Sequence, residues 1–222
     1  GMVPGLIAGI YRRDELSINL PHLCDRAGVA FVQAEIVGVD SQRQDLLLHQ
    51  RPALSFGVLS LDVGAVTRNL EHLSGVPIKP LEEALQFLSQ QDPEDPQPFR
   101  IVGAGPAGIE VALALRRRWP RRPLELQIRA GQLNATTKSI LRRAHIHCVT
   151  DASAHASLLC TGSRAPSWLA NSGFAVDHDG RVLTNSFLQL EGYPHLFASG
   201  DCAVMKSQPR PASGVWAVRS AV

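Results

Sequence analysis

The sequence predicts an α/β fold in which short buried strands end at glycines that face a ligand. A G-x-G-x-x-G loop, residues 103–108, lies between an apolar run and a segment with helical periodicity. Two other apolar strands, residues 59–64 and 158–162, each run into a glycine. A further apolar run near the C-terminus ends at Gly200 and Asp201.

The composition is typical of a globular protein without a strongly charged partner. The 222 residues are 45% hydrophobic, and 22 basic against 20 acidic residues give a formal charge of +2. This balance argues against a nucleic-acid or membrane surface. The apolar runs are too short to span a bilayer and no signal segment is evident, so we expect a cytoplasmic protein. The four cysteines lie far apart, which favours buried thiols over a redox disulfide or a zinc site.

Residues 1–88 are expected to form the first part of one domain. From Val29 to Gly64, apolar runs alternate with polar turns, a pattern typical of a β-meander that includes residues 30–32. The meander ends in the strand that reaches Gly64. Residues 89–98, SQQDPEDPQP, are rich in proline and acidic residues, and we interpret them as an interdomain linker.

Residues 99–165 are predicted to form a second domain. A strand over 99–103, a helix over 108–119 and a strand over 124–128 make a βαβ unit. A helix near 139–143, a strand over 146–149 and a strand over 157–161 follow, the last reaching Gly162. The strands that reach Gly64 and Gly162 form a weak internal repeat, although two ordinary buried strands would look the same.

The glycine loop has the residues that a dinucleotide pyrophosphate needs. Gly103 permits the tight turn, Gly105 lets the main chain approach the pyrophosphate, and Gly108 allows the helix to pack on the strand. The helix N-terminus adds N–H donors and positive potential. The residue expected on the adenosine ribose falls near Arg129, whose guanidinium suits a 2′-phosphate, although a solvated strand end is the alternative.

The segment 193–203, YPHLFASGDCA, resembles the second FAD fingerprint of the pyridine nucleotide-disulfide oxidoreductase superfamily; an ordinary turn is the alternative. With the glycine loop and Leu159-Cys160-Thr161-Gly162, the order of motifs is similar to that of type II NADH dehydrogenases. A closer similarity is to the flavoprotein domain fused to selenide, water dikinase, carried by residues 1–9, 59–64, 77–80 and 210–219.

The resemblance implies a Rossmann-like, two-dinucleotide-binding-domain flavoprotein with three layers, ββα, in an incomplete form, in which residues 166–222 complete the FAD-binding domain. It implies that NAD(P)H passes a hydride to FAD and that a quinone or another small acceptor is then reduced, with Glu110 near the nicotinamide and flavin. It also implies association with selenide, water dikinase, and we consider a homo-oligomer. The candidate cofactor-binding residues are Pro4, Gly64, Gly200, Asp201, Gly214 and Val215 for FAD, and Gly103, Gly105, Pro106, Ala107, Gly108, Arg129, Thr161 and Gly162 for NAD(P).

Two departures from this family leave a second class of function open. No G-x-G-x-x-G loop occurs in residues 1–98, and the nicotinamide domain lacks its longer excursion before residue 158, so we expect a fragment or truncated homologue. A non-catalytic nucleotide-binding module is the alternative; a disulfide reductase is disfavoured because no cysteine pair is present.

The arginines of residues 116–122 suit a helix C-terminus better than phosphate binding. His145, His147 and Cys148 lack a fourth metal ligand.

Overall fold

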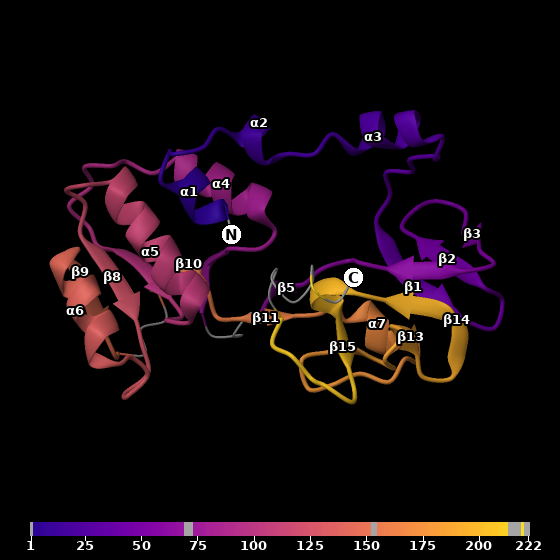
Figure 1. The fold of residues 1–222 in the computed structure, drawn as a ribbon. Helices are drawn as coiled ribbons and strands as arrows, with labels where there is room; N and C mark the ends of the chain where they lie inside the picture. Colours follow the sequence, from indigo (N-terminus) through magenta and orange to yellow (C-terminus); the bar gives the residue numbers. More distant parts are fainter. Residues whose placement is uncertain (1, 69–72, 152–154, 213–218, 220–222) are drawn as a thin grey trace. The chain divides into compact units, whose positions relative to one another are not determined.

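The computed structural model describes residues 2–68, 73–151, 155–212 and 219 (Figure 1). The chain forms two compact units, and each is described by itself. The first unit contains residues 1–18 and 67–162, and the second contains residues 19–66 and 163–222. The short strands β5 (Val66–Thr67) and β11 (Ser163–Arg164) lie where the chain passes from one unit to the other.

The first unit is built on a five-stranded sheet whose described strand pairs are all parallel. In sheet order, the strands are β6 (Ser74–Pro77), β10 (His155–Leu159), β7 (Phe99–Val102), β8 (Leu124–Gln127) and β9 (Ile146–Val149). The chain runs outward from β7 through β8 to β9 and then returns to β10 on the other side of β7. This reversal places a topological switch point at the carboxyl ends of β7 and β10.

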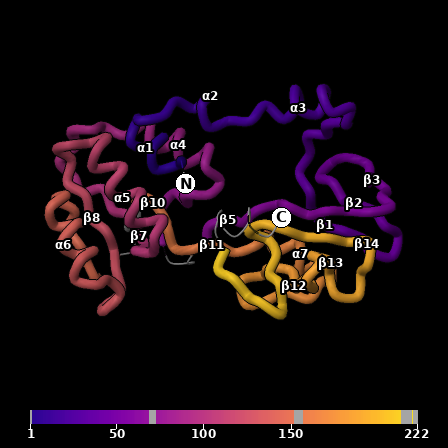
Figure 2. The backbone as a smooth tube through the Cα atoms, viewed as in Figure 1, coloured from indigo at the N-terminus to yellow at the C-terminus, as the bar shows by residue number. Residues whose placement is uncertain are grey.

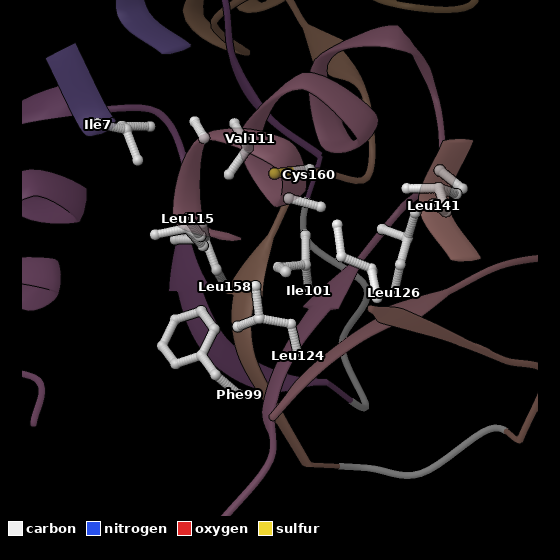
Figure 3. Packing of buried hydrophobic residues seen from close by; sticks show 14 of the residues in the cluster. Ile7, Phe99, Ile101, Val111, Leu115, Leu124, Leu126, Leu141, Leu158 and Cys160 are labelled. Atoms are coloured by element: carbon white, nitrogen blue, oxygen red, sulfur yellow. The ribbon is translucent and has the colours of Figure 1, made fainter. Parts of the chain in front are cut away.

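Helix α5 (Pro106–Arg118) covers the strands that flank this switch point. It begins with a proline at its first turn, where a missing N–H is harmless, and it ends before Pro120. Figure 3 shows Val111 and Leu115 of α5 beside the strand residues Ile101 and Leu158, all buried in one core. The unit also contains α1 (Val3–Ile7), α2 (Arg13–Leu16), α4 (Leu81–Ser89) and α6 (Ala135–Arg143). The predicted βαβ unit is therefore confirmed.

The segment predicted to be an interdomain linker instead lies against the surface of the first unit. Arg122, only 5% exposed, donates hydrogen bonds to the main-chain oxygen of Asp92 (2.8 Å) and to Asp95 Oδ2 (3.0 Å). Its guanidinium lies 5.1 Å from the ring centroids of both Phe99 and Trp119. Because this buried cation holds residues 89–98 in place, the segment does not separate the two units.

The observed units also differ from the expected domain boundaries. Strand β6 pairs with β10, and Ala84 and Leu88 of α4 are buried in the same core as α5. Residues 67–98 therefore belong with residues 99–162. The N-terminal residues 1–18, expected in the other domain, join them because Ile7 of α1 is buried in this core.

The second unit contains another five-stranded sheet and a small antiparallel one. The larger sheet has the order β15 (Ala203–Met205), β12 (Val182–Thr184), β13 (Gln189–Leu190), β14 (Tyr193–Ala198) and β4 (Leu59–Leu61). Helices α3 (Leu20–Ala27) and α7 (Trp168–Asn171) and a short 3-10 turn, Gly200–Cys202, complete the unit. Figure 2 follows the backbone through β12, β13 and β14.

The predicted meander is confirmed in two of its strands, β1 (Ile36–Asp40) and β2 (Asp45–Leu48), which form an antiparallel sheet with a third strand that was not predicted, β3 (Leu54–Ser55). The expected strand over 30–32 is wrong, since these residues are exposed and irregular. This apolar run finds no neighbouring strand to pair with in the described chain. None of the helices in the described residues is both long and apolar enough to cross a bilayer.

Candidate dinucleotide sites

The glycine loop connects β7 to α5 at the switch point of the first sheet. Gly103 has a φ of 107°, and a Cβ atom added there would lie 2.3 Å from the carbonyl oxygen of Cys160. A Cβ atom at Gly108 would lie 1.8 Å from the carbonyl oxygen of Gly103. Neither position can therefore hold a side chain without moving main-chain atoms. These are the roles that the sequence pattern predicts for the first and third glycines.

Gly105 differs, because the space beside it is open. It is the N-cap residue of α5, and a Cβ atom added there would have no neighbour within 4 Å. Pro106 and Ala107 follow it and are exposed. The first N–H groups of a helix have no partner within the helix, and they point toward this open space. The loop therefore fits a dinucleotide pyrophosphate: two glycines close it from behind, and the second leaves room for the ligand.

Thr161 and Gly162 lie beside this loop, at the end of the neighbouring strand β10. The Cys160 N–H donates to the carbonyl oxygen of Val102 (2.7 Å), which fixes the two strand ends together. Gly162 has a φ of 99° and open space at its Cβ position. The Thr161 hydroxyl donates to the main-chain oxygen of Arg68, and the Arg68 N–H donates to Gly162 (3.0 Å). Gly162 thus lies at the same edge of the sheet as the glycine loop, while the Thr161 hydroxyl binds the main chain at Arg68.

Three further predicted residues lie in the first unit. Arg129 follows β8 and is exposed; its N–H donates to Gln132 Oε1 (2.9 Å), while its guanidinium has no partner in the described chain. Glu110 is exposed on α5, two residues after Gly108. Pro4 lies in α1, so the structure places it in the unit of the glycine loop and not with Gly64, Gly200 and Asp201.

A second pair of strand ends lies in the second unit. Strands β4 and β14 are parallel neighbours, and the Ser199 N–H donates to the carbonyl oxygen of Leu61 (2.9 Å). Both strands then reach glycines with positive φ, 65° at Gly64 and 69° at Gly200. The structure therefore brings together the predicted residues Gly64, Gly200 and Asp201. Gly214 and Val215 lie outside the described residues.

The second strand-end site contains a carboxylate that sequence reasoning missed. A Cβ atom at Gly200 would lie 2.2 Å from Asp62 Oδ1, so Asp62 packs directly against this glycine. Asp201 and Ser199 also line a cleft of about 260 Å³ together with Thr184, Arg181 and Arg210. Carboxylate and hydroxyl groups can bind a polyol, and guanidinium groups can bind phosphate. The only signal in the sequence was the position of Asp62 two residues before Gly64.

The cysteines of these two sites, Cys160 and Cys202, are buried free thiols. Burial raises the pKa of the Cys160 thiol from 9.0 to about 12, and burial also raises the pKa of Cys202. All four cysteines are free. Among the residues that the structure places, no group of three or more histidine, cysteine or acidic side chains could hold a metal ion.

Comparison with known proteins finds similarity to oxidoreductases. A family model described as pyridine nucleotide-disulphide oxidoreductase matches residues 125–221. Ferroptosis suppressor protein 1 of Taeniopygia guttata is 25% identical over 219 residues, which cover 81% of this chain and 58% of that protein. Demethylphylloquinone reductase of Synechocystis sp. is 26% identical over 244 residues, covering 90% of this chain and 59% of that protein. The chain thus spans less than two thirds of these relatives.

Solved structures share the fold along almost the whole chain. The putidaredoxin reductase–putidaredoxin complex has a TM-score of 0.83 at 18% identity, covering 99% of this chain and 63% of that one. The water-forming NADH oxidase of Lactobacillus brevis, bound to NADH, has a TM-score of 0.80 at 15% identity, covering 99% of this chain and 58% of that one. The chain therefore shares the α/β fold of these oxidoreductases, and its residues 125–221 are similar to the pyridine nucleotide-disulphide oxidoreductase family.

Proposed function

We propose that this chain acts in an FAD-dependent oxidoreductase that takes a hydride from NAD(P)H. The observation that carries the proposal is the pair of glycine-lined strand ends, one in each unit. In the first unit, Gly103, Gly105 and Gly108 surround open space at the N-terminus of α5. In the second unit, Gly64 and Gly200 lie on neighbouring parallel strands. In open α/β sheets, the carboxyl ends of strands are where such ligands bind.

The first unit would bind the nicotinamide dinucleotide. The N–H groups at the start of α5 would donate to its pyrophosphate, and the exposed Arg129 would pair with a 2′-phosphate, which favours NADP over NAD. Pro106 and Ala107 would line the same turn, with Thr161 and Gly162 along its edge. Glu110, five residues after Gly105, would orient the nicotinamide end through its carboxylate.

The second unit would bind FAD through Gly64, Gly200 and Asp201, with Gly214 and Val215 as further candidates. The Asp201 carboxylate would accept hydrogen bonds from the ribityl hydroxyls; Pro4, which the family resemblance assigns to FAD, belongs to the first unit. When bound, the flavin would receive the hydride of the reduced nicotinamide and transfer electrons to a second acceptor. A quinone is the acceptor class we propose, because one relative is a demethylphylloquinone reductase. The resemblance of residues 59–64 and 77–80 also suggests association with selenide, water dikinase.

A nucleotide-binding module without redox activity is the second candidate. Residues 1–98 contain no second G-x-G-x-x-G loop, so the sequence offers only one such loop for pyrophosphate. Such a module would bind the dinucleotide through the loop before α5 and would bind no flavin.

A visible absorbance spectrum of the purified chain, before and after added FAD, tests the proposal. We expect flavin bands that bleach when NADPH is added and that bleach more slowly with NADH. Asp201→Asn should weaken FAD retention, whereas Glu110→Gln should retain FAD but slow bleaching about tenfold. Exposed Glu191, which follows β13 and pairs only with the exposed Lys206 (3.0 Å) in the described residues, provides the matched control as Glu191→Gln. A chain that stays colourless with excess FAD but binds NADPH would support the module instead.

A further inference from the structure

A basic cleft lies at the edge of the first sheet, away from the strand ends that form the glycine loop. It is formed by the outer face of α6 and by the edge strand β9, which are labelled in Figure 1. Its volume is about 410 Å³, within the range of small-molecule pockets. The residues that line it are Lys138, Arg142, His145, Ile146, His147 and Cys148.

The cations of this cleft are not neutralised by neighbours. Elsewhere in the first unit a basic side chain can form an ion pair with a carboxylate, as Arg100 does with Glu125 (2.7 Å). In contrast, neither Lys138 nor Arg142 has an ion-pair or hydrogen-bond partner on its side chain in the described residues. Glu125 pairs in register with His147 of β9, but its carboxylate is held by Arg100. No carboxylate lines the cleft.

The backbone holds these cations on one side of α6. Lys138 and Arg142 are four residues apart, so they lie on the same face of the helix. His145 follows in the left-handed region, with a φ of 52°, and its carbonyl oxygen accepts a hydrogen bond from Arg116 Nη2 (3.0 Å). This bond anchors the end of α6 to the end of α5. The backbone that carries the cleft is therefore fixed, while the side chains of Lys138 and Arg142 are exposed to solvent.

The remaining lining residues add no negative charge. Burial raises the pKa of the Cys148 thiol, while the charge of Lys138 opposes the shift, so the thiol stays protonated at neutral pH. Ile146 is buried and supplies an apolar floor. A guanidinium presents a fork of N–H donors, and an ammonium adds three more, a set that suits a tetrahedral oxyanion.

We propose that this cleft is an anion site for a phosphate-bearing small molecule, separate from the dinucleotide site. Arg142 would bind two phosphate oxygens and Lys138 a third, with the imidazoles of His145 and His147 at the rim. The volume exceeds that of phosphate alone, so an organic phosphate would place its carbon part against Ile146. The shared chemistry is the phosphate group, which free phosphate or a phosphate ester could supply.

Isothermal titration of the full chain, at constant ionic strength, tests this site with inorganic phosphate and with glycerol 3-phosphate. We expect both to bind the wild type, the ester more tightly if an organic phosphate is the natural ligand. The double substitution Lys138→Gln with Arg142→Gln should weaken binding at least tenfold. The matched control, Arg117→Gln with Arg143→Gln, removes two exposed positive charges outside the cleft and should change binding less than twofold.

Three outcomes would overturn the proposal. The wild type could fail to bind either probe, or the control variant could lose as much affinity as the cleft variant, which would indicate general electrostatic attraction. Alternatively, saturating NADH could abolish phosphate binding, which would place the anion at the glycine loop. Circular dichroism spectra of all variants, together with their thermal unfolding midpoints, separate loss of binding from loss of fold. NADH binding that is unchanged in the cleft variant would support two independent sites.

Discussion

Alanine at Gly105 should weaken dinucleotide binding and leave stability almost unchanged, whereas alanine at Gly108 should lower the stability of the fold. Gly105 has open space at its Cβ position and an ordinary φ of −71°. Alanine is a poorer N-cap than glycine by about 1 kcal/mol, but it reduces the entropy of the unfolded chain by a similar amount. We therefore expect the free energy of unfolding of Gly105→Ala to stay within about 1 kcal/mol of the wild type.

Gly108 has no such space. A Cβ atom 1.8 Å from the Gly103 oxygen forces either α5 or the loop to move by more than 1 Å. Overpacking of this kind typically costs about 1–3 kcal/mol or more, and the better helix propensity of alanine returns about 1 kcal/mol. Gly108→Ala should therefore lower the free energy of unfolding by about 2 kcal/mol or more.

Gly105→Ala, the variant expected to fold normally, should nevertheless bind NAD(P)H poorly. In Gly105→Ala the added methyl group occupies the space that a pyrophosphate would need, so we expect NAD(P)H affinity to fall at least about tenfold, or 1.4 kcal/mol. Urea unfolding measures stability, and fluorescence titration of NADPH measures affinity. A Gly105→Ala chain that binds NADPH as the wild type does would refute the assignment of the loop. A Gly108→Ala chain with an unchanged urea midpoint would refute the packing argument.

Three other substitutions test separate features by unfolding or titration. Removing the buried guanidinium in Arg122→Ala leaves its carboxylate partner uncompensated and should cost about 3 kcal/mol in urea unfolding, whereas Arg121→Ala, 83% exposed, should change stability by less than about 0.5 kcal/mol. The pKa of Cys160 is raised from 9.0 to about 12, so its contribution is present below pH 9 and is lost as the pH rises toward 12. The wild type should therefore lose about 1.4 kcal/mol more per pH unit above pH 9 than Cys160→Ala does, and parallel pH profiles would contradict this. Arg129→Glu should shift the ratio of NADPH to NADH affinity toward NADH by about tenfold or more, and an unchanged ratio would make Arg129 a solvated strand end.

The sequence predicts the glycine loop and its βαβ unit well because their signals are local. Gly103, Gly105 and Gly108 are spaced by the turn itself, and the apolar runs on either side show their periods within a few residues. The observed bounds of β7, α5 and β8 agree with the predicted ones to within a few residues. The second strand-end site was also predictable, since Gly64 and Gly200 each follow a short apolar strand.

The errors concern features that depend on distant partners. Residues 89–98 have the composition of a linker, and the buried side chain of Arg122, about 30 residues further along the chain, holds them against the first unit. The placement of α1 and β6 in the first unit likewise depends on long-range packing and pairing. Asp62 was missed for the same reason, because its contact with Gly200 joins residues that are far apart in the sequence.

The two sites also differ in what excludes a side chain from their glycines, and this difference predicts how each tolerates change. At Gly108 the obstacle is main-chain oxygen, whereas at Gly200 it is Oδ1 of Asp62, the far end of an exposed side chain. A side chain can rotate away, so Gly200→Ala should mainly incur the left-handed backbone strain, about 1–2 kcal/mol. A double-mutant cycle with Asp62→Ala, measured by urea unfolding, should then give a coupling energy below about 0.5 kcal/mol. A coupling above about 1 kcal/mol would mean that Asp62 is fixed in place and helps to shape the site that we assign to FAD.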